Sequence, residues 1–313
     1  MSRIIVVSNR MSVSIEKHSG EFHSYRSVGG LATGIASLPE SLEKIWIGWP
    51  GIHEEEVSQK EKKEITETLR QKNCYPVFVP QKQFDDYYEG FANKTIWPLF
   101  HYFTQYCIYD EHLWQAYKQV NQLFCDKVTE LVVPDDYIWV HDYQLMLLPG
   151  MLRQNLPAAK IGFFLHIPFP SFELFRLIPY RSEILEGLLG ADLVGLHTYD
   201  YVRHFISSAC RIAGLEHNLG KLSTDNRIVK VDAFPMGINY NKYRNAINNG
   251  VIALEISGIS KKINQGDKLE INIEEGCIKN LSTNEEIRIK PLPEFIKNIL
   301  DMGGLIPSIK RKN

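Results

Sequence analysis

Short runs of β-branched and aromatic residues alternate along the first three quarters of the chain with longer stretches of helical periodicity. Most of the short runs are continuously apolar, which is typical of strands covered on both faces of a sheet. The predicted strands are residues 3–9, 44–49, 75–80, 136–141, 160–166, 191–197 and 228–234, and the predicted helices are 53–72, 111–131, 143–155 and 199–214. Strands that alternate with helices predict an α/β fold with a parallel sheet and helices on both faces.

The pattern changes after about Tyr243. Residues 251–257 and 268–290 alternate between apolar and polar positions with a period of two, which is typical of antiparallel strands with one face in water. Residues 291–305 then predict one helix, begun by prolines and ended by a pair of glycines. The sequence therefore predicts two domains, residues 1–243 and 244–313, the second a small β-rich module with one helix.

Composition and charge narrow the class of protein. The chain has 313 residues, 44% of them hydrophobic and 23% charged, and its formal net charge is −2, so nothing predicts nucleic acid or an anionic membrane as a partner. The five cysteines stand singly, without a CxxC pair, which argues against a zinc site or a disulfide framework. No apolar stretch approaches the length of a membrane span or a signal peptide, and we expect a cytoplasmic protein.

Polar residues stand at the carboxyl ends of four predicted strands. The first strand leads into Ser8-Asn9-Arg10, the fourth into His141-Asp142, the fifth into His166 and the sixth into His197. A single histidine at a strand end is more often structural than functional. Because ligands of open parallel sheets bind beyond the carboxyl ends of the strands, four such ends together favour a site.

Two further segments have candidate binding residues. Gly29 and Gly30 precede a helical pattern, so their N–H groups could approach an anion, although two glycines also make an ordinary tight turn. Residues 84–103 are rich in aromatic side chains, which suit a sugar ring or a phosphate but also suit a plain core. Within this run Tyr88 and Trp97 are the better candidates for ligand contact.

Several enzyme classes lack support. The glycine segment is not GxGxxG, which disfavours a nicotinamide-dependent dehydrogenase, and no P-loop motif is present. Ser171 has no G-x-S-x-G elbow around it, so a serine hydrolase is not predicted either.

Seven blocks of the sequence resemble the trehalose-6-phosphate synthase family, in that family's order and over residues 1–243. They are SNR at 8–10, VGGLATG at 28–34, IWIGWPG at 45–51, YYEGFANKTIWPLFHY at 87–102, WVHDYQLMLLPGMLR at 139–153, GFFLHIPFPSFELFR at 162–176 and FPMGI at 234–238. The resemblance implies a retaining glucosyltransferase that joins UDP-glucose to glucose 6-phosphate. It also implies a GT-B fold of two Rossmann-like domains, of which residues 1–243 are the acceptor-side domain, with no cofactor and no metal.

The resemblance also implies roles for particular residues. Arg10 and Tyr88 would hold the phosphate of glucose 6-phosphate, Trp97 would pack beside it, and Asp142 would bind acceptor hydroxyls. Gly29 and Gly30 would approach the diphosphate of UDP-glucose, and His166 would lie against the transferred glucose. Retention without an evident protein nucleophile fits a front-face reaction, in which Asp142 and His166 orient the substrates rather than act as an acid–base pair.

The last part of the chain departs from that family. Only 75 residues follow Ile238, and they contain no R-x-D-Y-x-K-G segment of the kind that grips UDP-glucose. Residues 244–313 instead resemble the C-terminal part of the 3-isopropylmalate dehydratase small subunit, a swivelling domain. The two resemblances thus imply two partial genes joined near Lys242–Arg244, whether by a natural fusion, an engineered one or an assembly artefact, which makes the chain a chimera with an incomplete donor site.

Three functions follow as hypotheses. The first is the glucosyltransferase, with turnover near background, and the second is a glucose 6-phosphate-binding module without catalysis. The third is a hydro-lyase small subunit with an iron–sulfur partner. In each case we expect an uncovered cleft face that favours self-association.

Overall fold

The computed structural model describes residues 3–18, 21–26, 31, 34–35, 42–224, 227–235, 262–263, 267–272 and 276–288. The chain divides into two compact units, residues 1–236 and 237–313. The division after residue 236 lies close to the predicted boundary at 243, and it does not by itself identify the kind of domain in either unit.

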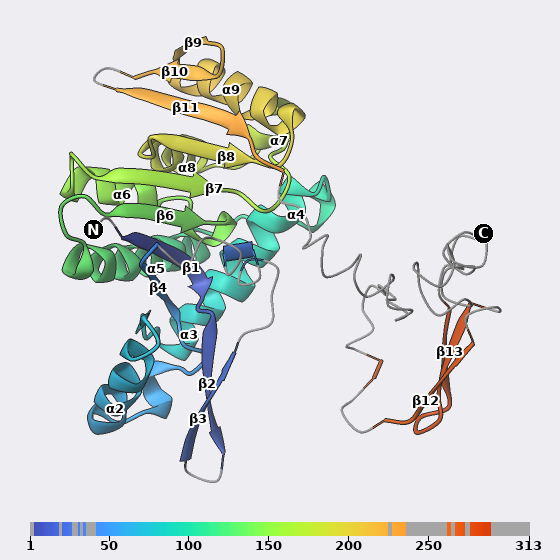
Figure 1. The fold of residues 1–313 in the computed structure, drawn as a ribbon. Helices are drawn as coiled ribbons and strands as arrows, with labels where there is room; N and C mark the ends of the chain where they lie inside the picture. Colours follow the sequence, from blue (N-terminus) through green and yellow to red (C-terminus); the bar gives the residue numbers. More distant parts are fainter. Residues whose placement is uncertain are drawn as a thin grey trace, which may run out of the picture. The chain divides into compact units, whose positions relative to one another are not determined.

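The first unit is built on a sheet whose strand order is β5-β4-β1-β6-β7-β8-β11-β10-β9 (Figure 1). Every pairing from β5 to β11 is parallel, and only β10 and β9 run antiparallel at the edge. The strands are β1 (Ile4–Arg10), β4 (Lys44–Trp49), β5 (Cys74–Pro76), β6 (Tyr137–His141), β7 (Lys160–Phe164), β8 (Leu193–Leu196), β9 (Glu216–Asn218), β10 (Lys221–Ser223) and β11 (Ile228–Ala233). The predicted parallel sheet and its seven strands are confirmed, with the third strand shorter than predicted.

Helices cover the sheet on both sides, which explains the continuous apolar runs. In β1, Ile5 and Val7 belong to the large core on the face covered by several of the helices, whereas Val6 belongs to a smaller core on the other face, with Ile65 and Leu69 of another helix. The longer helices are α2 (Gln59–Arg70), α5 (Glu111–Leu131), α6 (Leu148–Asn155), α8 (Arg181–Leu189) and α9 (Tyr199–Ala213). Ser58 and Thr198 cap α2 and α9, and left-handed Gly214 ends α9 as predicted.

Several short elements were not predicted. They are the hairpin β2 (Val13–His18) and β3 (Glu21–Arg26), the turns α3 (Gln81–Phe84), α4 (Trp97–Phe100) and α7 (Phe172–Phe175), and the π-helix η2 (Asp85–Ile96). Single turns of 3-10 helix also occur at η1 (Glu54–Glu56), η3 (Thr104–Tyr106) and η4 (Tyr143–Leu145). The predicted helices 53–72 and 143–155 are each split, because a 3-10 turn precedes the regular helix.

The second unit contains a three-stranded antiparallel sheet in the order β12 (Leu269–Asn272), β13 (Cys277–Asn280) and β14 (Glu285–Arg288). Asn284, at the turn before β14, adopts a left-handed φ of 60°, and the buried Asn280 side chain accepts from the N–H groups of Ser282 and Thr283. The antiparallel pattern predicted for 268–290 is thus confirmed. The predicted strand 251–257 and the predicted helix 291–305 lie outside the described residues.

Candidate functional site

The carboxyl ends of the central strands form one rim of the first unit, and we call it the carboxyl rim. Asp142 follows β6, and its backbone N–H donates to the carbonyl of Phe164 on β7 at 2.8 Å. Leu165, after β7, donates to Gly195 of β8 at 3.1 Å. These bonds extend the parallel register past the strands, so the polar residues that follow each strand lie side by side, as the sequence predicted.

Three histidines meet on this rim. Nδ1 of His141 lies 3.0 Å from Nε2 of His166, and their ring centroids are 5.3 Å apart. The His197 ring centroid is 6.0 Å from that of His166. His141 is fully buried, whereas His166 is half-buried. The cluster joins the ends of β6, β7 and β8 into one polar surface.

The electrostatics of the cluster keep the imidazoles neutral and the carboxylate charged near pH 7. Burial lowers the pKa of all three histidines, that of His166 to about 4 and that of His141 well below its usual range. Burial raises the pKa of Asp142 to about 6, and hydrogen bonds from the backbone N–H groups of Tyr143 and His166 oppose that rise. Near pH 7 the rim therefore presents the charged carboxylate of Asp142 beside uncharged imidazole rings that can form hydrogen bonds.

Asp142 has an unusual backbone conformation. Its φ of 75° and ψ of 170° fall in a region that is essentially reserved for glycine. Both backbone groups are nevertheless bonded, because the N–H donates to Phe164 and the carbonyl accepts from Leu145 at 3.1 Å. The carboxylate in turn accepts the N–H of His166 at 3.1 Å. The surrounding bonds thus hold Asp142 in a strained conformation that fixes its side chain against the loop of His166.

The loop 165–171, which contains His166, is held at both ends. Besides the bond to Asp142, the His204 ring of α9 donates to the carbonyl of Phe169 at 3.1 Å. The Tyr102 hydroxyl accepts the N–H of Ser171 at 3.2 Å, and Tyr102 itself has a left-handed φ of 69°. Sequence reasoning missed Tyr102 and His204, because no local signal pairs residues so far apart in the chain.

Arg10 ends β1 with an exposed side chain. Its guanidinium carbon lies 5.0 Å from the centre of the Trp49 ring, at the end of the neighbouring strand β4. Within the described parts of the chain, no carboxylate forms an ion pair with Arg10. The guanidinium is therefore available to an anionic ligand on this rim.

The aromatic segment lies on η2 and α4, and it is joined to the rim by hydrogen bonds. The buried Tyr87 donates to Asn9 at 3.1 Å, and Tyr143 donates to Asn93 at 2.9 Å. Tyr88 is half-buried against Phe84, with ring centroids 5.3 Å apart. The strand-end pattern included Asn9, whereas Asn93 was not among the predicted site residues.

Trp97 is 40% exposed and stacks on His101, with ring centroids 4.1 Å apart. An exposed indole face is compatible with the predicted sugar contact.

Gly29 and Gly30 lie outside the described residues, so their predicted role at a diphosphate stays a prediction. In the described ranges, no group of three or more His, Cys, Asp or Glu side chains could hold a metal ion, and no helix is long and apolar enough to cross a membrane.

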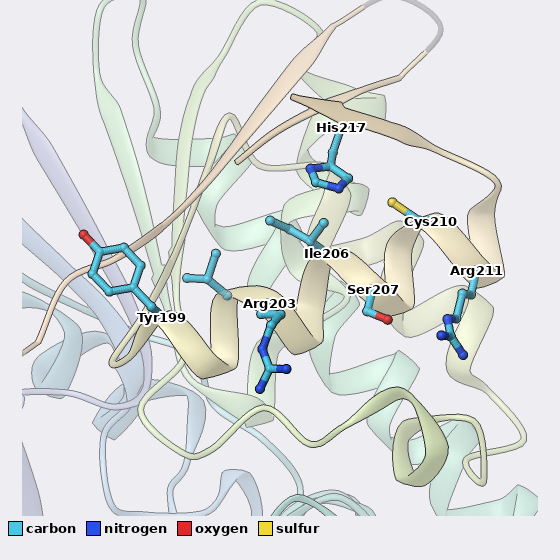
Figure 2. A pocket seen from close by; sticks show the side chains of 8 residues that line it. Tyr199, Arg203, Ile206, Ser207, Cys210, Arg211 and His217 are labelled. Carbon is cyan, nitrogen blue, oxygen red and sulfur yellow. The ribbon is translucent and has the colours of Figure 1, made fainter. Parts of the chain in front are cut away.

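A separate cavity of about 440 Å³ lies along α9 (Figure 2). Its lining comes from α9, including Tyr199, Ile206 and Cys210, and from His217 of β9. Arg203, which also lines the cavity, pairs with the exposed Asp200 at 3.1 Å. None of the predicted site residues lines this cavity, so it is not part of the carboxyl rim.

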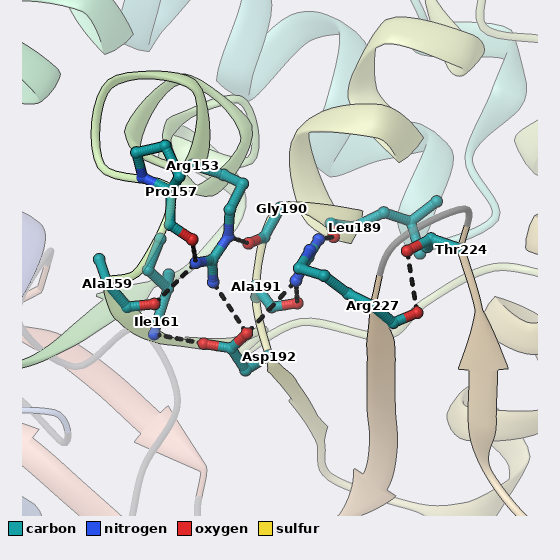
Figure 3. Close-up of polar contacts among 10 residues, drawn as sticks. All are labelled: Arg153, Pro157, Ala159, Ile161, Leu189, Gly190, Ala191, Asp192, Thr224 and Arg227. Carbon is teal, nitrogen blue, oxygen red and sulfur yellow. Dashed lines mark hydrogen bonds and ion pairs between the residues drawn. The ribbon is translucent and has the colours of Figure 1, made fainter.

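The opposite rim, where the parallel strands begin, has a different chemistry (Figure 3). Asp192, before β8, accepts from Arg153 at 2.8 Å and from Arg227 at 3.3 Å. Arg153 also donates to the carbonyls of Gly190, Pro157 and Ala159. Arg3 and Asp136, before β1 and β6, form an ion pair at 2.7 Å. These charged side chains bond to other groups of the protein. Their bonds hold together the loops between helices and strands.

Comparison with solved structures identifies the class of protein. A UDP-forming α,α-trehalose-phosphate synthase of Burkholderia xenovorans matches 80% of this chain with a TM-score of 0.65 and 32% identity, over 51% of its own length. The N-terminal domain of a trehalose-6-phosphate phosphatase of Candida albicans matches 79% with a TM-score of 0.67 and 31% identity, also over 51% of that chain. The first unit is therefore a Rossmann-like domain of the GT-B type.

The chain belongs to glycosyltransferase family 20, whose sequence profile matches residues 2–276. An α,α-trehalose-phosphate synthase of Dictyostelium discoideum is 43% identical over 98% of this chain, and one of Emericella nidulans is 37% identical over 98%. The chain spans 42% and 62% of the length of these relatives. The profile match continues past the predicted junction near residue 243, and the comparisons do not show the dehydratase resemblance.

Proposed function

We propose that the carboxyl rim binds glucose 6-phosphate and forms the acceptor side of a site for retaining glucosyl transfer from UDP-glucose. The observation that carries the proposal is the Arg10 guanidinium, which has no ion-pair partner among the described residues and lies on the same rim as Asp142 and His166. A guanidinium gives a phosphate a fork of hydrogen-bond donors, and an ionised carboxylate accepts from sugar hydroxyls. A solved relative from Burkholderia xenovorans, 28% identical, is described as a complex with glucose-6-phosphate.

Each residue then has a distinct role. Arg10 and Tyr88 bind the phosphate, Trp97 packs beside the acceptor, and Asp142 orients its hydroxyls. His166 contacts the glucose of the donor, and Gly29 and Gly30 approach the diphosphate. Burial lowers the pKa of His166 to about 4, which makes its ring a weak base, and the Asp142 carboxylate accepts a backbone N–H, so both are proposed as orienting groups rather than as an acid–base pair. Their contribution is positioning and charge stabilisation of an oxocarbenium-like sugar.

Calorimetric titration with glucose 6-phosphate tests the acceptor site. The full chain should bind, and Arg10→Ala should weaken the affinity roughly 10- to 100-fold, the usual value of hydrogen bonds to a charged partner. Arg10→Lys should restore only part of that affinity, because an ammonium lacks the fork. Arg203→Ala is the control, since Arg203 already pairs with Asp200 and is not among the predicted site residues. Equal binding by the parent chain and Arg10→Ala would contradict the proposal.

A second assay separates transfer from binding. The expectation from the sequence is that UDP release from UDP-glucose and glucose 6-phosphate is near background. If glucose 6-phosphate binds and UDP is not released, the non-catalytic binding module is the better description. The likeness to a domain of a protein named as a phosphatase is compatible with that alternative. Turnover that depends on Arg10 and His166 would favour the transferase.

The origin of residues 244–313 remains a separate proposal. The antiparallel sheet β12–β14 is compatible with a fragment of a dehydratase small subunit, and the hydro-lyase hypothesis predicts a stable complex with an iron–sulfur large subunit. Co-purification of the two would support it. Retention of the large subunit by residues 1–236 alone would exclude a role for the tail.

The proposed self-association rests on exposed aromatic side chains near the rim. Between residues 102 and 109 the structure exposes Tyr102, Phe103, Tyr106, Ile108 and Tyr109. Such a patch favours contact with another surface. Light scattering after size exclusion should show a molar mass that rises with concentration, and Tyr106→Ser with Phe103→Ser should reduce that rise.

A further inference from the structure

The fully buried ring of His141 has one nitrogen bonded and one without a partner. Nδ1 lies 3.0 Å from Nε2 of His166. Nε2 of His141 is sealed from solvent and has no hydrogen-bond partner within the described residues. The nearest aromatic neighbour is Trp139, whose ring centroid is 4.5 Å away. This asymmetry decides where the protons of the two rings reside.

Two neutral imidazoles can hydrogen-bond only if one supplies an N–H and the other a lone pair. If His166 were the donor through Nε2, His141 would need its proton on the sealed Nε2, as a buried N–H without a partner. Orphaned buried N–H groups are rarer than under-satisfied acceptors. An N–H···π contact with Trp139 would recover only part of the cost, because such contacts are weak. The lower free energy belongs to the arrangement in which His141 donates through Nδ1.

That arrangement fixes the tautomer of His166. Its Nε2 must then be the lone-pair acceptor, and its single proton resides on Nδ1. Nδ1 of His166 has no hydrogen-bond partner within the described residues, and it is not among the polar atoms sealed from solvent there. Nδ1–H is therefore the group that His166 offers to a ligand.

We propose that His141 is a positioning residue whose Nδ1–H holds His166 in the Nδ1–H tautomer, so that His166 presents a hydrogen-bond donor to a ligand oxygen. The tautomer is a property of the unliganded chain. Its role toward a ligand rests on the proposed function, in which that oxygen belongs to the glucosyl hydroxyls or to the diphosphate of UDP-glucose. Both oxygens are acceptors, and a donor fixed in advance binds either without a change of tautomer.

Nitrogen NMR of the full chain with ¹⁵N-labelled histidine tests the tautomer directly, because long-range proton–nitrogen spectra separate protonated from bare ring nitrogens. His166 and His141 are assigned from the signals lost in His166→Asn and His141→Asn. The expected result is that both rings are protonated at Nδ1 and bare at Nε2. A proton on Nε2 of His166 in the parent chain would overturn the proposal.

Variants separate positioning from packing. His141→Phe removes the donor, and His166 should then change to a mixture of tautomers. His141→Asn can still donate through its amide, so it should retain the Nδ1–H signature. His112→Gln is the control, because His112 lies at the surface and pairs with Asp86. An unchanged His166 signature in His141→Phe would contradict the role of His141. If His141→Phe does not fold, the parent spectrum alone still decides the tautomer.

Ligand titrations identify the oxygen. A shift of the His166 Nδ1 signal with UDP alone indicates the diphosphate, whereas a shift only with UDP-glucose indicates a glucosyl hydroxyl. His141→Phe should weaken binding of that ligand about tenfold, the value of one hydrogen bond. The expected tautomer with no response to either ligand would support the positioning role and contradict the proposed donor contact. A ligand response of His166 with its proton on Nε2 would support contact between His166 and the ligand, and it would contradict the positioning role of His141.

Discussion

The two rims of the parallel sheet contain the same kinds of charged and polar residue, but they differ in how completely these groups are bonded within the protein. At the opposite rim, Arg153 and Arg227 share Asp192 and also cap backbone carbonyls. At the carboxyl rim, Arg10 has no ion-pair partner within the described residues, and one nitrogen of His141 has no hydrogen-bond partner there. Asp142 is also held in a strained conformation.

This difference supports the proposal that the carboxyl rim binds ligands, whereas the bonded groups of the opposite rim stabilise the fold. Satisfied polar groups stabilise a fold, because an unpaired buried group costs free energy. Unsatisfied or strained groups persist only where the surrounding structure holds them in place, and they concentrate at functional sites. The comparison makes predictions about stability at one rim and binding at the other.

The largest expected effect is on the pH dependence of stability at the carboxyl rim. The pKa of His166 is about 4 in the folded chain, below its ordinary value, so the unfolded chain takes up a proton first as the pH falls. The folded state then loses about 3 kcal/mol between pH 6.5 and about pH 4. His166→Asn should remove that loss, which urea unfolding at about pH 7 and about pH 4 would measure.

Asp142 acts in the opposite direction. Its pKa is about 6 in the folded chain, above its ordinary value, so the folded state gains stability as the pH falls from about 6 to about 4. Asp142→Asn should therefore be destabilised more by acid than the parent chain, by about 2 kcal/mol. Parallel pH profiles of the parent chain and both variants would contradict the assignment of these groups.

At the opposite rim, Arg153→Ala should lower the free energy of unfolding by about 2 kcal/mol, because three backbone carbonyls lose the Arg153 donor and Asp192 loses one of its donors. Binding of glucose 6-phosphate should not change. Arg203→Ala is the matched control, since its exposed pair with Asp200 contributes less than about 1 kcal/mol. A loss of binding in folded Arg153→Ala would remove the distinction between the rims.

Strain at Asp142 is tested by comparing glycine with alanine at one position. Both variants lose the carboxylate, but only glycine adopts a φ of 75° without strain. Asp142→Gly should therefore be more stable than Asp142→Ala by about 1–2 kcal/mol. At Asp200, in the first turn of α9, the order should reverse, because glycine is a poor helix former. The same order at both positions would show that Asp142 is not strained.

The smallest expected effect concerns the loop of His166. Tyr102→Phe removes the hydroxyl that accepts the N–H of Ser171, and it should cost about 1 kcal/mol or less. Amide hydrogen exchange of residues 165–171 should accelerate, while exchange in β7 should not. Unchanged exchange in the loop would mean that Asp142 and His204 hold it without Tyr102.

The order and type of the main elements were predictable, because a parallel sheet covered on both faces needs continuous apolar strands. The site was predictable only in part. The positions of Asp142, His166 and His197 followed from strand ends, since parallel strands place their carboxyl ends on one rim. The bonds from Tyr102 to Ser171 and from His204 to Phe169 join residues 69 and 35 positions apart, which no periodicity reveals. The π-helix η2 also escaped prediction, because its Asp, Tyr, Gly, Asn and Thr residues are weak formers of an ordinary helix.

The sequence alone defined the α/β class, the rim on which the polar residues lie, and the family, because apolar periodicity and local motifs are written in consecutive residues. It did not define the state of those polar residues. The neutral histidines, the raised pKa of Asp142 and its strained backbone depend on burial and on neighbours from other strands. Burial and long-range hydrogen bonds exist only in the folded chain, and they turn His141 and His166 from two strand-end histidines into a hydrogen-bonded pair.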